Sequence, residues 1–221
     1  MKTITISKKG SRSEFNEDAL LSLPVKGVFL VSDGVGGGPS GHKASRTTVH
    51  NLYETLSSIE ITQDAIIKSI STANDAVYQK ALEGEHKGMA CTLVLAWCDG
   101  ERLTCFNIGD SRIYRIRNGL IEQLTSDQTK QVKRNDRMKS LVTNAIGVKP
   151  SVTAELTEWD WVDGDLVMLM SDGISDVVSD NEMQDLVTAE GVSMLEKANA
   201  LIAASVANGS TDDKTLVFCF N

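Results

Sequence analysis

The sequence predicts an α+β fold in which antiparallel sheets are covered by helices. Short runs of β-branched and apolar residues dominate it, and most of these runs end on turn residues. Two turns, in DGERL (99–103) and RNGLI (117–121), are typical of β-hairpins, so neighbouring strands should be antiparallel. The helical segments fall into two groups separated by a block of strands, which favours sheets covered by helices over a βαβ alternation.

Nine segments are expected to be strands. Each is a short run that is rich in β-branched or apolar residues, with turn residues at most of its ends. In chain order they are TITIS (3–7), DALLSL (18–23), VFLVS (28–32), CTLVLAW (91–97), RLTCFNI (102–108), RIYRIR (112–117), VTAELT (152–157), DLVMLM (165–170) and TLVFCF (215–220).

Four helices are expected, in two pairs. In the first pair, apolar residues recur at helical spacing over 49–56 and again over 66–77, and Gly84 follows the second stripe. In the second pair, each helix opens with a Ser-x-x-Glu capping box. These boxes are Ser179 with Glu182 and Ser193 with Glu196, and Gly209 ends the last helix.

Composition indicates one sizeable domain over residues 1–221 and excludes some partners. The net charge of −8 and the pI of about 4.9 argue against nucleic acid or an anionic membrane. No run approaches the roughly 18 apolar residues of a membrane span, and the N-terminal run MKTITISKKG lacks the apolar core of a signal peptide. The four cysteines show no CxxC spacing and are expected to be reduced thiols in a cytoplasmic protein.

Carboxylates stand repeatedly where a strand begins or ends. The same Ser-Asp-Gly sequence follows two apolar runs and places Asp33 and Asp172 at their ends. Each carboxylate alone has the simple alternative of a turn residue, but several at converging strand ends would repel one another unless cations neutralised them. Oxygen ligands favour Mg²⁺ or Mn²⁺ over Zn²⁺. The whole set is Glu17, Asp18, Asp33, Asp110, Asp172, Asp212 and Asp213.

Other catalytic patterns are poorer matches. The glycines from Gly36 to Gly41 fit G-x-G-x-x-G between a strand and a helix, but two helical stripes follow instead of the second parallel strand that a dinucleotide-binding unit needs. Cys105 lies inside a strand and is separated from Arg112 by six residues, so the C-x5-R pattern of a cysteine phosphatase is absent. Among the histidines, His42 opens the helix after the glycine loop and is a candidate for a catalytic role.

Five motifs together resemble a known family. In order, NED, VSDGVGG, NIGDSRIYRIRNGLIEQLTSDQT, LMSDGISD and DDKT look like the successive motifs of the metal-dependent protein phosphatases, the PPM or type 2C class, over about residues 16–215. The resemblance implies two packed antiparallel sheets flanked by pairs of helices, a four-layer α-β-β-α sandwich. It also implies a compact serine/threonine phosphatase of the bacterial type.

The resemblance assigns metal ligands residue by residue. Asp33 would bridge two ions, Mn²⁺ or Mg²⁺. One ion would also be served by Glu17, by the carbonyl of Gly34 and, through water, by Asp18. The resemblance gives the other ion to Asp172 and Asp212, and a third, weaker ion to Asp110. Two close cations lower the pKa of a bridging water and orient the hydroxide for direct in-line attack on phosphoserine or phosphothreonine.

Three positions depart from the family pattern. Arg12, the implied phosphate-binding residue, stands four residues before Asn16 instead of three. Val35 stands in the loop where eukaryotic members carry His, so the leaving group would be protonated by water or by His42. The last motif reads Asp212-Asp213 instead of Asp-Asn, so either carboxylate is a candidate ligand.

The segment 126–150 corresponds to a flap beside the metal site in the family. Within it, KQVKRNDRMK (130–139) is a basic stretch in an acidic protein. One interpretation is a solvated helix face. The other is that basic residues, Lys133 and Arg134 in particular, steer a phosphorylated protein toward the acidic site.

The expected partners follow from the resemblance. They are a phosphorylated protein substrate and a serine/threonine kinase or its targets, with the chain acting as a monomer. Two alternative functions stay open on the sequence alone: a phosphatase-like regulatory or binding module with weak catalysis, and a two-metal hydrolase of small phosphorylated metabolites.

Overall fold

Two five-stranded antiparallel sheets form the centre of the protein. The computed structural model describes residues 1–35, 40–134 and 137–221, without the side chains of 134 and 137–139. All strand pairs within the sheets are antiparallel. The first sheet has the order β1 (Lys2–Lys8), β12 (Lys214–Phe220), β11 (Leu166–Met170), β6 (Arg112–Arg117), β7 (Leu120–Gln123). The second has the order β10 (Glu155–Asp160), β5 (Arg102–Ile108), β4 (Leu93–Asp99), β3 (Val28–Ser32), β2 (Ala19–Leu23).

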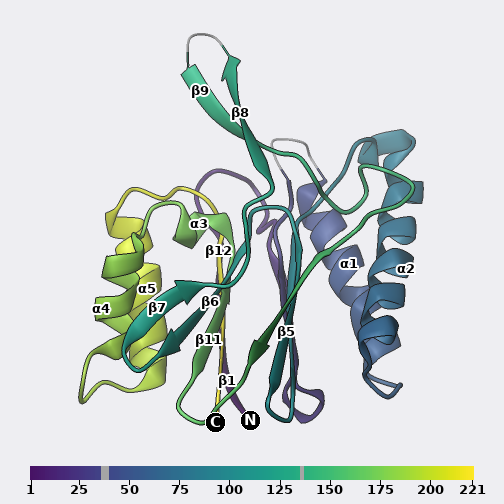
Figure 1. Cartoon of the computed structure of the whole chain (residues 1–221). Coiled ribbons are helices and arrows are strands. Elements are labelled where there is room, and N and C mark those ends of the chain that lie inside the picture. The colour runs from purple at the N-terminus through teal and green to yellow at the C-terminus, as the bar shows by residue number, and fades with distance from the viewer. Residues whose placement is uncertain (36–39, 135–136) are drawn as a thin grey trace.

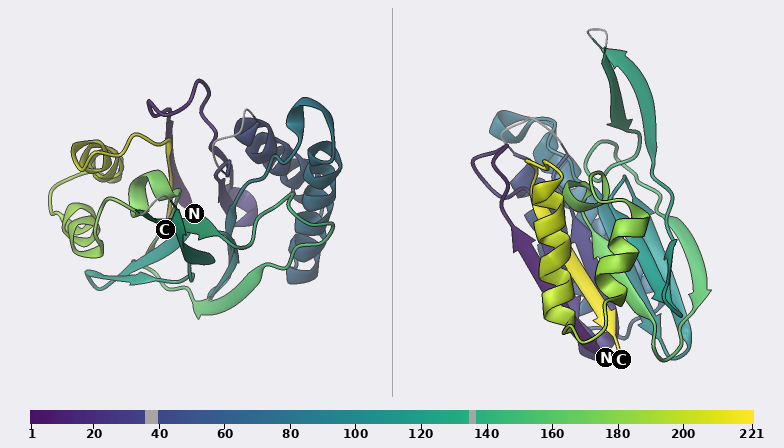
Figure 2. Two further views of the ribbon diagram at one scale, coloured as in Figure 1. Left: turned by 90° about the horizontal axis from the view of Figure 1, so that it is seen from above. Right: turned by 90° about the vertical axis from the view of Figure 1, so that its left-hand side faces the viewer.

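A pair of helices covers the outer face of each sheet (Figures 1 and 2). The first pair, α1 (Gly41–Leu56) and α2 (Gln63–Ala81), packs on the β2–β10 sheet, and the second, α4 (Asp180–Thr188) and α5 (Met194–Ala207), packs on the β1–β7 sheet. A third apolar layer lies between the two sheets and includes Phe29, Val94, Val167 and Val217. The predicted α+β class and the four-layer α-β-β-α sandwich are therefore confirmed. The shorter helical pieces are α3 (Asp172–Ser175), η1 (Pro24–Lys26) and η2 (Gly84–His86).

Local signals explain where several elements start and turn. At the β6–β7 hairpin Asn118 and Gly119 both have positive φ, 52° and 78°, as an Asn-Gly hairpin turn requires. Helix α5 begins with the full capping box that Ser193 and Glu196 predict. At α4 the Ser179 side chain accepts the Glu182 N–H as predicted, while the Glu182 carboxylate accepts from Asn208 at 2.9 Å.

Several segments differ from the sequence prediction. The strand β7 was not among the nine expected strands, and β4 starts two residues later than the expected CTLVLAW. The strand β10 starts three residues later than the expected VTAELT, because Val152 and Ala154 pack as loop residues against the α1–α2 side of the core. The basic segment is not a helix: it forms the strands β8 (Thr129–Arg134) and β9 (Arg137–Val142), which pair with each other and project from the sandwich beside α3 (Figure 1). The interpretation as a solvated helix face was therefore wrong. Of the predicted glycine loop, Gly36 to Gly41, residues 36–39 lie outside the described part.

No helix among the described residues has the length and apolar character needed to cross a bilayer. The four cysteines are all buried and free.

The glycine of each Ser-Asp-Gly turn allows a close backbone approach. A Cβ on Gly34 would lie 2.5 Å from the backbone of Gly41 at the start of α1. A Cβ on Gly173 would lie 1.8 Å from the carbonyl oxygen of Asp213. Real Cβ contacts are never so short. Each turn can therefore place its Asp, Asp33 or Asp172, at this end of the sandwich only if the residue after the Asp is glycine.

Replacing Gly173 by alanine is therefore expected to destabilise the fold. The added methyl group must displace the Asp213 backbone, and we expect a loss of about 3 kcal/mol or more in the free energy of unfolding. Gly209→Ala is the control, because Gly209 has a positive φ (87°) but a Cβ added there would meet no atom within 4 Å, so it should cost only about 1 kcal/mol. A loss at Gly173 no larger than the loss at Gly209 in urea unfolding would show that the close approach to Asp213 does not make Gly173 necessary.

Candidate metal and phosphate site

Two carboxyl groups from different sheets meet at one end of the sandwich. Asp33 follows β3 of one sheet, and Asp172 follows β11 of the other. The two side chains lie close enough for each to shift the pKa of the other. The backbone of Asp33 is held on both sides by Thr92, whose N–H donates to the Asp33 carbonyl at 2.7 Å and whose Oγ1 accepts the Asp33 N–H at 3.0 Å. The site is thus built where the two sheets come together.

Asp18 adds a third carboxyl group, which is 5% exposed. Its Oδ2 accepts a hydrogen bond from Ser171 Oγ at 2.7 Å, and Ser171 Oγ accepts the Thr215 N–H at 3.0 Å. The Ser of the second Ser-Asp-Gly turn therefore links Asp18, at the start of β2, to β12 of the other sheet. Sequence reasoning missed this role of Ser171, although its repetition beside each Asp was a usable signal.

The three carboxyl groups have raised pKa values because they are buried close together. Burial raises the pKa of Asp18 to about 7, although the hydrogen bond from Ser171 acts to lower it. Burial, and after it the charges of Asp18 and Asp172, raises the pKa of Asp33 well above its usual value. Burial and the charge of Asp212 raise the pKa of Asp172 to about 6. The cluster therefore holds more negative charge than it can stabilise at neutral pH without a cation.

Glu17 and Gly34 lie at the start of helix α1. The Glu17 carboxylate accepts a hydrogen bond from the Gly41 N–H, and the Gly34 N–H donates to the Glu17 carbonyl at 3.1 Å. A Cβ on Gly41 would lie 2.5 Å from Glu17 Oε1 and 3.2 Å from the Gly34 carbonyl oxygen. Both predicted oxygen donors, the Glu17 side chain and the Gly34 carbonyl, thus face the same glycine.

The two adjacent carboxylates of the last motif have different surroundings. Asp213 is 4% exposed, and its two oxygens accept the backbone N–H groups of Gly10 and Glu17, each at 2.7 Å. Asp212 is partly exposed, pairs with Arg12, and acts electrostatically on both Asp33 and Asp172. The structure therefore brings Asp212 to the cluster and uses Asp213 to fasten the N-terminal loop.

Arg12 points toward the cluster despite its one-residue displacement in the sequence. Its backbone N–H donates to the Thr211 carbonyl at 3.1 Å, and its guanidinium pairs with the Asp212 carboxylate. The charge of Asp212, followed by those of Asp172 and Asp33, raises the pKa of Arg12. A guanidinium that is 56% exposed and close to these carboxylates is placed to contact an anion that enters the cluster.

Asp110 lies on the β6 side of the cluster, after β5. Burial, and then the charges of Asp172, Asp176 and Asp127, raises its pKa to about 7. The neighbouring Ser111 Oγ is 2.7 Å from Thr92 Oγ1, so the turn that carries Asp110 is tied to the residue that holds Asp33. Asp176 belongs to this acidic edge too, although sequence reasoning did not single it out.

His42 and the hairpin lie around this end of the molecule. The His42 ring stacks on Phe15, with ring centroids 4.7 Å apart. Burial, and then the charges of Arg46, Lys43 and His86, lowers the pKa of His42. Lys133 is exposed on β8, and the side chain of Arg134 lies outside the described residues.

The cluster fits a divalent cation, although its side chains now bond to one another. In the part of the chain that the structure describes, no group of three or more His, Cys, Asp or Glu side chains is arranged to hold a metal ion as it stands. The Asp212 carboxylate is paired with Arg12, and Asp18 accepts a hydrogen bond from Ser171. Two buried oxygens, Asp18 Oδ1 and Asp172 Oδ1, nevertheless have no hydrogen-bond partner. Unpartnered carboxylate oxygens and repelling charges are what a hard cation would satisfy.

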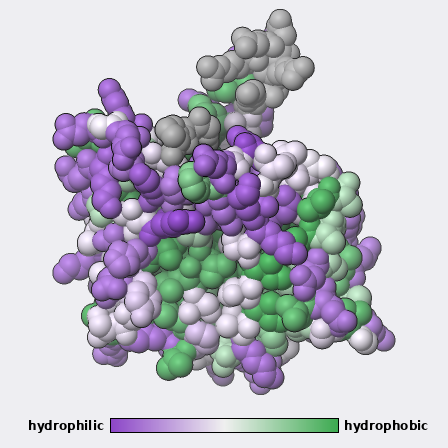
Figure 3. Space-filling model, turned by 180° about the vertical axis from the view of Figure 1, so that it is seen from behind, coloured by the Kyte–Doolittle hydropathy of each residue, from purple (hydrophilic) through white to green (hydrophobic). Residues whose placement is uncertain are grey.

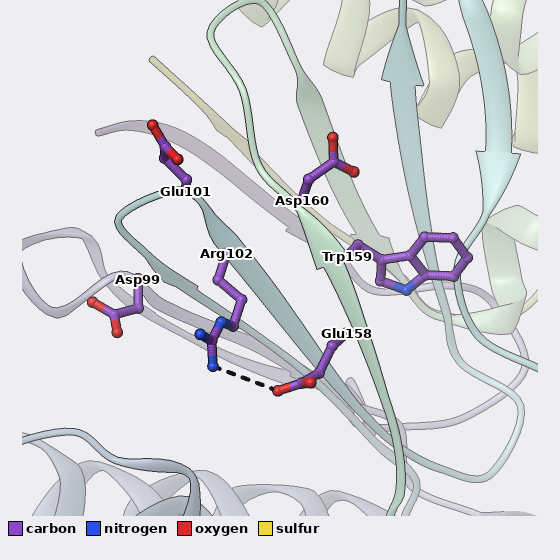
Figure 4. A pocket seen from close by; sticks show the side chains of 6 residues that line it. All are labelled: Asp99, Glu101, Arg102, Glu158, Trp159 and Asp160. Carbon is purple, nitrogen blue, oxygen red and sulfur yellow. Dashed lines mark ion pairs between the residues drawn. The ribbon is translucent and has the colours of Figure 1, made fainter.

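A second acidic cavity lies at the far end of the β2–β10 sheet (Figure 4). It has a volume of about 550 Å³, and its lining residues include Asp99, Glu158, Asp160 and Arg102, with Arg102 paired to Glu158 at 3.8 Å. β4 runs from Leu93, next to Thr92, to Asp99, so this cavity is separated from the Asp33 cluster by about 20 Å of strand.

The chain was compared with known proteins, and the family model described as protein phosphatase 2C matches residues 8–208. The serine/threonine phosphatase stp of Listeria welshimeri is 28% identical, with 86% of this chain and 82% of that protein covered. The crystal structure of the Mycobacterium tuberculosis serine/threonine phosphatase PstP/Ppp matches with a TM-score of 0.84 and 28% identity, covering 98% of this chain and 97% of the other. A structure of the catalytic domain of PstP in complex with two manganese ions matches with a TM-score of 0.84 and 26% identity, covering 98% and 96%.

The different surroundings of Asp212 and Asp213 predict different losses on mutation. Asp213→Ala leaves two backbone N–H groups without acceptors, so the metal-free protein should lose about 3 kcal/mol of unfolding free energy. Asp212→Ala removes a partly exposed carboxylate and should change that free energy by less than about 1 kcal/mol, while weakening Mn²⁺ binding measured by calorimetry. If Asp212→Ala keeps full Mn²⁺ affinity and Asp213→Ala loses it in a folded protein, the two residues have been assigned the wrong way round.

Proposed function

Since the chain belongs to the protein phosphatase 2C family, we propose that it removes phosphate from phosphoserine and phosphothreonine in proteins with divalent metal ions bound at the Asp33 cluster. It is a metal-dependent protein serine/threonine phosphatase by family and by fold. The observation that carries the site assignment is the contact between Asp33 and Asp172, which joins two sheets through two acidic side chains. Such a contact is favourable only when a proton or a cation lies between the carboxylates.

The metal ligands that we propose are the oxygens that face this contact. Asp33 would be shared by two ions, Asp172 and Asp212 would complete one of them, and Glu17 with the Gly34 carbonyl would complete the other. Asp18 is buried and accepts a hydrogen bond from Ser171, so we propose that it acts on a metal ion through a water molecule. When bound, the ions supply the positive charge that acidifies a water molecule and neutralises phosphoryl oxygens. Carboxylate and carbonyl donors suit both Mn²⁺ and Mg²⁺, and Asp110 is the proposed donor to a third, weaker ion.

The side chains of the protein have three tasks around the ions. Asp33 and Asp172 would hold the ions from opposite sheets, and Thr92 fixes the Asp33 backbone. Arg12 would leave Asp212 and contact the phosphoryl oxygens, since both partners are partly exposed and the guanidinium already lies beside the cluster. Water would protonate the leaving serine or threonine, because burial and then the surrounding cations lower the pKa of His42, so that less of it carries the proton to be donated.

The substrate that we propose is a phosphorylated protein, either folded or extended around the phosphorylated residue. The hairpin β8–β9 projects at the end of the sandwich where the carboxylates meet, so we propose that the segment 126–150 is a flap and that Lys133 and Arg134 on it guide the substrate (Figure 1). A serine/threonine kinase, or the targets of one, is the partner that such a substrate implies, and the chain would act as a monomer. The four free, buried cysteines support a reducing compartment such as the cytoplasm.

Hydrolysis of an aryl phosphate and of a phosphothreonine peptide tests the proposed function. We expect the purified chain to hydrolyse both with Mn²⁺ and neither with excess chelator. Asp172→Asn should lower kcat/KM by more than about 100-fold on both substrates, since even residues behind metal ligands cost 10- to 100-fold. Glu158→Gln in the far acidic cavity is the matched control and should retain wild-type rates. Hydrolysis that persists in chelator, or in Asp172→Asn, would exclude this metal site.

A further inference from the structure

A cavity lined by cations lies beside the acidic cluster. It has a volume of about 430 Å³, within the range of roughly 300–1,000 Å³ for ligand pockets. Its side chains come from the start of α1, the end of α2 and η2, and Met89 lies at its floor, 4% exposed. The polar lining residues are His42, Lys43, Arg46, Thr47, Lys80 and His86. Three permanent positive charges gather here in a protein whose net charge is −8, and the surface over these ends of α1 and α2 is hydrophilic (Figure 3).

Part of this lining is fixed by hydrogen bonds. Lys43 Nζ lies 3.2 Å from His86 Nε2, and His86 Nδ1 lies 3.3 Å from Ser40 Oγ. An ammonium group can only donate, so His86 accepts through Nε2 and donates through Nδ1. Ser40 Oγ in turn donates to the Glu85 carbonyl at 3.2 Å. The wall formed by Lys43 and His86 is therefore in place before any ligand arrives.

The side chains of the other two cations, Arg46 and Lys80, can turn toward a ligand. Arg46 is exposed and forms no ion pair with any carboxylate in the described ranges, and Lys80 donates only weakly to Thr47 Oγ1, at 3.5 Å. Two acidic side chains lie nearby. Glu85 is 82% exposed and 3.6 Å from Lys43 Nζ, and Glu14 acts weakly on His42. These exposed carboxylates do not neutralise three cations, so the cavity stays electropositive.

The cavity adjoins the catalytic cluster through helix α1. Gly41, the first residue of α1, contacts the Glu17 carboxylate, and His42 follows it in the cavity wall. Arg46 lies five residues beyond Gly41, about 7.5 Å along the helix axis. Two or three residues of an extended peptide span about 7–10 Å. A peptide whose phosphorylated residue enters the cluster can thus place a neighbouring side chain in the cavity.

We propose that this cavity binds a second anionic group of the substrate, two or three residues from the phosphoserine or phosphothreonine that is hydrolysed. The proposal rests on the function proposed above. Its ligand is a phosphorylated side chain or a carboxylate, because both offer acceptor oxygens to Lys, Arg and imidazole N–H groups. The enzyme would then prefer multiply phosphorylated or acidic segments.

Three matched phosphothreonine peptides test the proposal. One has neutral neighbours, one carries a non-hydrolysable phosphonate two or three residues away on either side, and one carries glutamate at those positions. For the wild-type chain with Mn²⁺ we expect kcat/KM on the phosphonate peptide to exceed that on the neutral peptide on the order of tenfold. The gain should shrink as salt increases. A gain with glutamate as well identifies any acidic side chain as a ligand, and a gain with phosphonate alone assigns the cavity to phosphorylated residues.

Charge-reversed variants test whether the cavity causes this gain in kcat/KM. Arg46→Glu, and independently Lys80→Glu, should abolish the gain while leaving aryl phosphate hydrolysis unchanged, which also shows that each variant is folded. Lys68→Glu is the control, since it makes the same charge change on an exposed part of α2 outside the cavity. Equal kcat/KM on the neutral and phosphonate peptides in the wild type, or a gain that survives in both variants, would overturn the proposal. If the proposed phosphatase function itself is wrong, the wild-type chain will not hydrolyse the aryl phosphate.

Discussion

The structure depends on one unfavourable contact, the approach of the Asp33 and Asp172 carboxyl groups across the boundary between two sheets. Each follows a fully buried strand, β3 or β11, so neither can move away without breaking its sheet. Asp18 and Asp212 bring further negative charge to the same point. A globular core alone would not retain such a cluster, because like charges in a buried place are strongly destabilising. Divalent cations bound there, as we propose, would make the arrangement favourable and would link the stability of the fold to its catalytic capacity.

Several residues around the cluster keep the carboxylates in position. Thr92 fixes the Asp33 backbone, Ser171 joins Asp18 to β12, and Asp213 holds the N-terminal loop that carries Arg12 and Glu17. Gly34 and Gly173 let the backbone pass closely behind Asp33 and Asp172. The same end of the sandwich carries both the acidic cluster and the electropositive cavity on α1 and α2. Under the proposals made here, an anionic substrate would meet cations on one side of the site and metal ions at its centre.

The sequence predicted the parts that depend on local pattern. Nine strands, the two helix pairs and the Asn118-Gly119 turn follow from periodicity and turn chemistry, and the repeated Ser-Asp-Gly predicted that Asp33 and Asp172 would share a site. Other features depend on tertiary packing. Nothing local distinguishes Asp212 from Asp213, because the backbone N–H groups that bond to Asp213 come from about 200 residues away. The cavity at Arg46, Lys80 and His86 could not be read from the sequence either, since it exists only where α1, α2 and η2 meet. The β8–β9 hairpin was missed because most of its residues are polar and lack a clear strand alternation.

Thermal unfolding of the metal-free and Mn²⁺-loaded protein at pH 5 and pH 8 tests the central claim most directly. The folded pKa values of Asp18 and Asp172, about 7 and about 6, lie above the unfolded value of 3.8, so these groups bind more protons in the folded state. Stability of the metal-free protein should therefore be present at pH 5 and fall as pH rises toward 8. Mn²⁺ should restore it, and the rise in Tm should be larger at pH 8, where the carboxylates are ionised. A metal-free Tm that is equal or higher at pH 8, together with no rise on adding Mn²⁺, would contradict the account.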